Sequence, residues 1–302
     1  MRQLLPLALF LLVGVTVGCT SDASTAPEPS GSGPTDIAAA QAIVVSSSAE
    51  LTTALSSATA GARIRLRAGS YNITQPLVVP DGATLEGEGV MQFDSERLPT
   101  GFRSGTRTTL TMTANVPGDV ISLGNGSALR RLVIDDLAGR AGNAVGVVSR
   151  DAGDRVSADI DEVEIFNRTG HAVGPQGPTG CAITALTRNL NSGSAPAPHE
   201  GASITARITH SLLHAPATGV GCGLFAFNFA PLADVNVFLA DNVVGGGLIA
   251  AGGVSRPDAV YESETSILSH RNVYRSGTDT PCTVRRTGWN LQGGSGIPLP
   301  QP

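Results

Sequence analysis

Short runs of alternating apolar and polar residues follow one another along most of the chain, and glycine, asparagine or aspartate separates one run from the next. This pattern is typical of short β-strands joined by turns. In the stretch GARIRLRAGSYNITQPLVVPDGATLEGEG, residues 61–89, three arginines alternate with Ile64 and Leu66. The alternation predicts a strand with one face toward solvent and one toward a core. We expect this stretch to begin the fold, and any chemistry to lie on later strands.

One segment has helical spacing instead. In SSSAELTTALSSATAG, Ser47 precedes Glu50 by three residues, as in a capping box, and Gly61 follows as a stop signal. The apolar residues between them recur on one helical face, at Leu51, Ala54, Leu55 and Ala58. The sequence therefore predicts a single helix, which would cap the first strands.

Five later segments repeat one another. They align on anchors spaced by 31, 48, 31 and 30 residues, namely Leu132, Val163, Ser211, Asn242 and Asn272. The positions two residues after the anchors are apolar or amphipathic: Ile134, Ile165, Leu213, Val244 and Tyr274. The positions three residues before the anchors are apolar in four of five cases: Leu129, Ile160, Ile208, Leu239 and Ser269. Such columns are typical of stacked coils, which bury their inner faces against their neighbours, so we predict an all-β parallel solenoid.

The succession AELTTALSSATAGARIRLRAGSY, LVVPDGATLEGEG and the later LVIDD and VEIFN segments resembles the pectate lyase-like β-helix superfamily. The resemblance covers most of residues 45–290. It implies a right-handed parallel β-helix with an N-terminal capping α-helix. It is more specific for fold than for chemistry, because the superfamily contains polysaccharide lyases, hydrolases, adhesins and proteins of no known activity.

The chain begins with one arginine followed by an apolar run that ends in small residues. Residues 1–18 therefore predict a secretory signal peptide. The ending TVGC resembles a bacterial lipoprotein signal, which implies that Cys19 is lipidated; cleavage followed by secretion is the alternative. Residues 19–42 read as a flexible linker, and residues 43–302 as one β-helix domain. We expect an exported protein that meets the membrane only through its lipid anchor.

The composition excludes some classes of mechanism and partner. All 20 basic residues are arginine, which excludes a lysine base or Schiff base, and the net charge of −5 without a basic run argues against nucleic acid as a partner. The cysteine spacing fits no zinc site. Cys181 and Cys222 each follow glycine at the start of corresponding strands in neighbouring repeats, so they form either a disulfide or two buried thiols.

A charged column precedes the anchors: Arg131, Glu162, His210, Asp241 and Arg271. Most neighbouring charges in this column are of opposite sign, which indicates a ladder of ion pairs rather than a site. Two insertions are candidate contact surfaces: the segment MQFDSERLPTGFRSG at 91–105, and the proline-rich stretch that contains APAPHEG.

Polar residues also follow the anchor strands of three successive repeats. The candidate catalytic residues are Asp135, Asp136, Arg168, His171 and His214. Paired carboxylates near an arginine and a histidine suit acid–base cleavage of a glycan, or binding of an acidic sugar. The same residue types are ordinary in turns, and most polygalacturonase motif elements are missing. We therefore expect a protein that binds a polysaccharide or cell-envelope glycan and could cleave it as a lyase or glycosidase, or else a non-catalytic adhesin or envelope structural protein.

A calcium site is a further hypothesis. Asp159, Asp161 and Glu164 occur within one predicted strand and could supply carboxylate ligands to calcium. Acidic residues are also common on exposed strand faces, so the alternative is a solvated surface.

Overall fold

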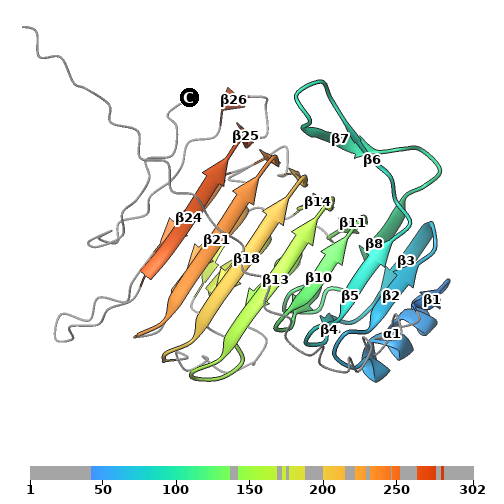
Figure 1. The fold of residues 1–302 in the computed structure, drawn as a ribbon, viewed down its shortest axis with the longest axis horizontal. Coiled ribbons are helices and arrows are strands. Elements are labelled where there is room, and N and C mark those ends of the chain that lie inside the picture. Colours follow the sequence, from blue (N-terminus) through green and yellow to red (C-terminus); the bar gives the residue numbers. More distant parts are fainter. Residues whose placement is uncertain are drawn as a thin grey trace, which may run out of the picture. The chain divides into compact units, whose positions relative to one another are not determined.

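Three parallel β-sheets make up most of the fold (Figure 1). The computed structural model describes residues 42–136, 142–168, 172–174, 177–187, 200–214, 222–228, 232–245, 247–251, 264–276 and 280–281. Sheet I contains β1 (Ile43–Val45), β2 (Arg63–Leu66), β5 (Thr84–Gly87), β10 (Ser127–Arg130), β13 (Arg155–Asp161), β18 (Ser203–Thr209), β21 (Asp234–Ala240) and β24 (Glu264–His270).

Sheets II and III consist mainly of shorter strands. Sheet II contains β3 (Gly69–Ile73), β8 (Thr108–Met112), β11 (Val133–Asp135), β14 (Glu164–Phe166), β19 (Leu212–His214), β22 (Val243–Gly245), β25 (Val273–Ser276) and the antiparallel edge strand β26 (Thr280–Pro281). Sheet III contains β4 (Leu77–Val79), β9 (Ile121–Leu123), β12 (Val145–Val148), β17 (Cys181–Leu186), β20 (Cys222–Phe227) and β23 (Gly247–Ala251). Two antiparallel hairpins belong to none of the three sheets: β6 (Met91–Phe93) pairs with β7 (Pro99–Phe102), and β15 (Ala172–Gly174) pairs with β16 (Gly177–Thr179).

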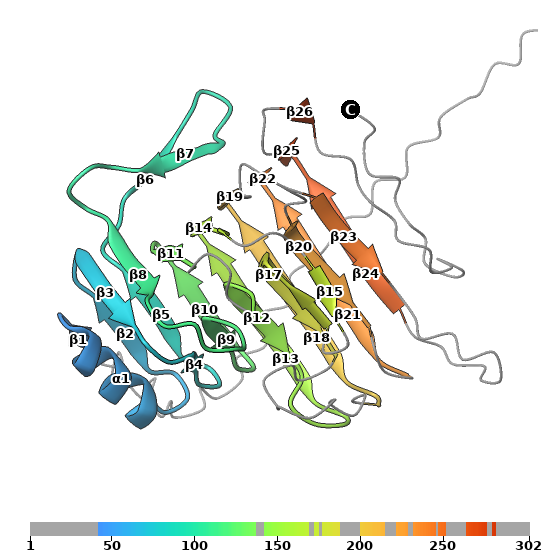
Figure 2. The same cartoon turned by 180° about the vertical axis from the view of Figure 1, so that it is seen from behind.

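From β2 to β25, apart from the two hairpins, the chain passes through sheets I, II and III in turn and adds one strand to each sheet at each passage (Figure 2). The strand register reproduces the repeat found in the sequence. Leu129 lies beside Ile160 in sheet I, and Ile134 lies beside Ile165 in sheet II. In the first four of the five repeats, the residues three before and two after the anchors, from Leu129 and Ile134 to Leu239 and Val244, point into one hydrophobic core. The prediction of an all-β parallel fold is therefore confirmed.

The predicted helix is present as α1 (Ser48–Ser57), which packs on β1 to β4. The Ser47 hydroxyl accepts a hydrogen bond from the Glu50 amide, as an N-cap does. The Glu50 carboxylate accepts from the Ser46 amide at 2.7 Å rather than from Ser47, and this bond lowers the pKa of Glu50. The helix is short, and no helix in the described part of the chain has the length and apolarity that a membrane span needs.

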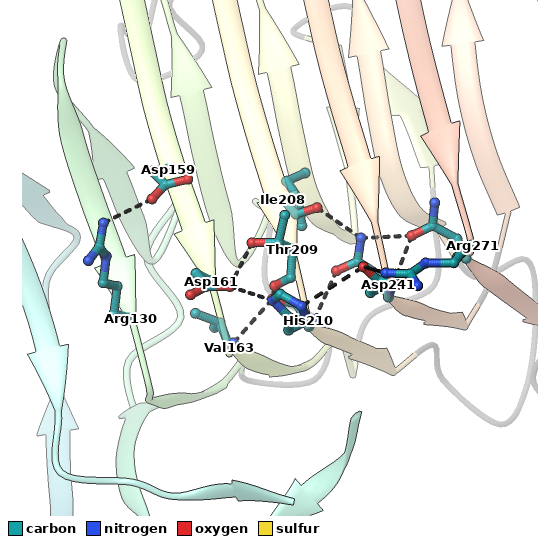
Figure 3. A network of polar contacts seen from close by, with 12 residues as sticks. Arg130, Asp159, Asp161, Val163, Ile208, Thr209, His210, Asp241 and Arg271 are labelled. Carbon is teal, nitrogen blue, oxygen red and sulfur yellow. Dashed lines mark hydrogen bonds and ion pairs between the residues drawn. The ribbon is translucent and has the colours of Figure 1, made fainter. Parts of the chain in front are cut away.

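The charged column forms the corner between sheets I and II. All five residues have a left-handed backbone, with φ of 53° at Arg131, 53° at Glu162, 48° at His210, 56° at Asp241 and 48° at Arg271. This conformation turns the chain sharply, at a cost of roughly 1–2 kcal/mol for a residue with a Cβ. Arg271 bonds Asp241 at 2.7 Å (Figure 3). Arg131 pairs with Glu86 of the preceding repeat. The predicted ladder is found only in part: within the column Asp241 pairs with Arg271 and lies 3.9 Å from His210, whereas Arg131 pairs with a residue outside it.

In the anchor column, buried polar side chains hold neighbouring repeats in register. The Ser211 hydroxyl accepts from the Val163 amide at 3.1 Å, and Asn242 Oδ1 accepts from the Ser211 amide at 2.8 Å. Asn272 Oδ1 accepts in turn from the Asn242 amide at 2.9 Å. Each side chain thus satisfies a backbone donor of the preceding repeat, which explains why polar anchors replace Leu132 and Val163 in the later repeats.

A disulfide joins β17 to β20. Cys181 and Cys222 are neighbours in register, with Cα atoms 4.5 Å apart, and the structure has them bonded rather than as free thiols. Both are fully buried and pack with Val148, Leu186 and Phe225. Residues 1–41, which include the predicted signal peptide, Cys19 and most of the linker, lie outside the described residues.

Candidate functional site

The outward face of sheet II brings together three of the five predicted polar residues: Asp135, Arg168 and His214. Because Ile134, Ile165 and Leu213 point into the core, the residues on either side of them point outward. The position after the core residue is Asp135 on β11, Phe166 on β14, His214 on β19 and Gly245 on β22. These four residues are called the outer strip below.

Two aromatic rings stack at the centre of the outer strip. The rings of Phe166 and His214 are nearly parallel, at 5°, with centroids 4.4 Å apart. This separation matches the spacing of neighbouring strands, so the register itself sets the stack. The guanidinium groups of Arg107 and Arg168 lie 5.9 Å and 5.7 Å from the Phe166 ring centroid. At these distances both cations are attracted by the aromatic face.

A buried carboxylate fixes the histidine. Glu164 is almost fully buried, and its two oxygens bond Arg107 Nη2 at 2.6 Å and His214 Nε2 at 3.0 Å. Burial acts to raise the pKa of the Glu164 carboxyl, but the hydrogen bonds with His214 and Arg107 outweigh it and leave the pKa below its ordinary value. Glu164 is therefore held as a carboxylate that orients the His214 ring.

Asp135 is engaged by an arginine. Arg168 donates to its carboxylate through Nε and through Nη2, the latter at 2.9 Å, in a bidentate pair. This hydrogen bonding raises the pKa of Arg168. The pair spans β11 and the end of β14, so it ties two neighbouring repeats together at one border of the aromatic stack.

The predicted carboxylate pair does not form. Asp135 faces outward, whereas Asp136 is only 1% exposed. Strand alternation continues through the aspartates, so adjacent residues point to opposite sides. Asp136 is therefore unavailable to a bound glycan, and the expectation of two catalytic carboxylates is wrong. His171 lies outside the described residues.

The calcium hypothesis fails on geometry. The left-handed corner at Glu162 separates Asp159 and Asp161, on β13, from Glu164 on β14. Asp159 pairs with Arg130 at 3.0 Å, and Asp161 accepts from Thr209 at 2.6 Å and faces His210 Nδ1 at 3.0 Å (Figure 3). Within the described part of the chain, no group of three His, Cys, Asp or Glu side chains could hold a metal ion.

The insertion at 91–105 supplies hairpin β6–β7, which borders the outer strip. Met91 and Phe102 form an apolar cluster with Val133 and Leu212, the outward residues nearer the corner. Phe93 meets the His210 ring edge-on at 5.8 Å. The hairpin therefore covers the corner side of sheet II and leaves the outer strip beside it.

Sequence reasoning found Asp135, Arg168 and His214 but missed the aromatic partner. Phe166 occupies the same repeat position as Asp135 and His214, so the alignment contained the signal that could have identified it. Arg107 was missed because it precedes β8, two repeats earlier than the residue it contacts. A separate surface groove of about 580 Å³ lies beside α1 and β4, and its lining contains none of the predicted site residues.

Comparison with known proteins adds little. No protein-family model matches the chain, and no curated protein matches it. A solved structure of ORF18 from Geobacillus virus E2 aligns with 76% of this chain, at 10% identity and a TM-score of 0.25. The chain spans 58% of that protein. A similarity of this degree supports no statement about function.

Proposed function

We propose that this protein is an exported β-helix protein that binds a polysaccharide on its outer strip without cleaving it. The passage of successive strands through three parallel sheets supports a parallel β-helix, and the resemblance to the pectate lyase-like superfamily supports its right hand. The predicted signal peptide and Cys19 support export and a lipid anchor in the cell envelope.

The stack of Phe166 on His214 carries this proposal. Its rings stand on a rigid sheet, both side chains are partly exposed, and two arginines flank them. Aromatic faces bind the apolar CH faces of sugar rings, while arginines can bond hydroxyl or carboxylate oxygens around them. The arrangement therefore suits a glycan.

The ionisable groups favour binding over cleavage. Glycoside hydrolysis requires an acid of raised pKa and a second carboxylate across the scissile bond. Glu164 has a lowered pKa, is buried and is bonded to Arg107 and His214, and Asp135 is engaged by Arg168. Asp136 points away from the outer strip. No two of these carboxyl groups can share the acid and base roles.

Binding to a glycan panel tests the proposal. We would measure the affinity of the wild type and of Phe166→Ala and His214→Ala for acidic and neutral polysaccharides such as polygalacturonate, alginate, xylan and dextran. Phe238→Ala is the matched control, because Phe238 also lies beside an arginine, Arg207 at 5.8 Å, but on sheet I. We expect about tenfold weaker binding for both strip variants, from the loss of a ring contact, and no change for the control.

Cleavage is followed in the same samples through new reducing ends and absorbance near 235 nm. We expect neither signal from the wild type. Product formation that Phe166→Ala or His214→Ala abolishes would show an enzyme at this site. Failure to bind any glycan would overturn the proposal and favour a structural role in the envelope.

A further inference from the structure

The outer strip continues past His214 to a residue without a side chain. One face of the His214 ring is covered by Phe166, and on the other side lies β22, where Gly245 directly follows Val244, the register partner of Leu213. His214 takes part in one ring contact within the described part of the chain, the one with Phe166. Its second face is therefore directed over Gly245.

The strand spacing makes this position suitable for a ring. Phe166 and His214 stack at 4.4 Å because each stands on its own strand. A third ring at the same spacing would stand over β22, where Gly245 itself has no Cβ to obstruct it, and β25, with Arg275 as the register partner of Gly245, would border it on the far side. The hydrogen bond between His214 and Glu164, which Arg107 holds in turn, fixes the ring against which this third ring would stack.

The borders of this position limit what can enter it. On the corner side, Val243 of the same strand packs against the apolar cluster that Met91 and Phe102 form under hairpin β6–β7. The sheet closes the position from below, and His214 closes one face. In a linear 1,4-linked chain, the two glycosidic bonds of an internal pyranose lie on opposite sides of its ring. Each such direction would send one neighbouring sugar into the sheet or into the hairpin cluster.

We infer that the outer strip recognises the terminal sugar of a glycan or of a branch, stacked on His214 over Gly245. This inference rests on the proposed function and deepens it, because it names chain ends rather than chain interiors as the ligand. The sugar enters on edge, and the remainder of the glycan leads away from the hairpin.

A substitution that fills the position tests its location. Gly245→Val places a branched side chain, which a strand accommodates well, where the sugar would stack. Thr111→Val is the matched control, because Thr111 occupies the same column on β8, beyond Asp135, and has no contact with the stack in this proposal. We expect at least tenfold weaker binding of the best glycan of the panel by Gly245→Val, with unchanged circular dichroism and melting, and wild-type binding by Thr111→Val. Unchanged binding by folded Gly245→Val would overturn the inference even if His214→Ala still weakened binding.

Chain-end counting tests the ligand class independently of any variant. The same mass of the best-binding polysaccharide is cut enzymatically to shorter lengths, and each sample competes for the wild type. If terminal sugars are recognised, competing strength rises in proportion to the number of ends. Competing strength that stays constant per unit mass would refute recognition of ends while leaving glycan binding at the outer strip intact.

Discussion

At the scale of single residues, Glu164 is the buried carboxylate that orients His214 of the outer strip. It receives hydrogen bonds from Arg107 and His214, which lie two repeats and one repeat away from it respectively. A carboxylate that is removed from water in this way stabilises the fold only while both partners bond it. Its loss should therefore affect stability as well as the orientation of His214.

We expect Glu164→Gln to lower the free energy of unfolding at pH 7 by about 1–3 kcal/mol, because Arg107 and His214 lose an ionic partner. The folded pKa of Glu164 is below its ordinary value, so its contribution is present above about pH 4.3 and is lost as the pH falls through the folded value. The difference between wild type and variant should accordingly shrink from pH 7 to pH 3 in urea unfolding.

The control is Glu88→Gln, because Glu88 pairs with Arg65 and Arg67 on the exposed face of the first strands. Exposed pairs contribute about 1 kcal/mol or less. A Glu164→Gln effect that does not change with pH would contradict the assigned role of the carboxylate.

Residue identities predicted the backbone better than they predicted the site. The column from Arg131 to Arg271 was identified from its charges, and the structure places it at the corners. The sequence predicts a carboxylate pair because it suggests a turn at Asp135; although β11 ends there, the Asp136 amide still bonds the Phe166 carbonyl of the next repeat and its side chain is buried. Whether a terminal strand residue still alternates depends on the next repeat, which local sequence does not encode.

At the scale of elements, the disulfide between β17 and β20 joins two strands of sheet III across 41 residues of chain. That segment includes the proline-rich insertion, so the bond closes a long loop. Loop closure of this length restricts the unfolded chain, which is the main source of disulfide stabilisation in the chain-entropy description.

We expect Cys181→Ala with Cys222→Ala to lower the free energy of unfolding by about 3–4 kcal/mol. Urea unfolding measures the effect, and reduced wild-type protein should lose a similar amount. If reductant destabilised the double variant as much as the wild type, another bond would be responsible. Equal stability of wild type and variant under oxidising conditions would exclude a stabilising role.

Elements were predictable where the repeat is regular. The helix at Ser48–Ser57 follows from its N-cap and apolar face, and the strands around the anchors follow from their columns. The packing of hairpin β6–β7 against Val133 and Leu212 was not predictable, because it joins an insertion to strands about 30 and 110 residues further along. Arg107 was hidden from the comparison of repeats in the same way, because it lies 57 residues before Glu164.

At the scale of the whole molecule, stacking explains how a chain with few aromatic residues could build the recognition surface that we propose. Each repeat contributes one residue to each column, and strand spacing then sets the distance between column members. Asp135, Phe166, His214 and Gly245 are one such column. The residues of the proposed binding surface thus come from different repeats, and a motif search within one repeat does not detect them.

The location of glycan binding is the central claim, and hydrogen–deuterium exchange of the wild type with and without the best-binding glycan tests it most directly. We predict added protection in peptides that cover Glu164–Phe166, Leu212–His214 and Val243–Gly245, because these strands carry the outer strip. Sheet III strands Val145–Val148 and Cys181–Leu186 should be unchanged. Protection confined to sheet III, with none on the three sheet II strands, would contradict the account.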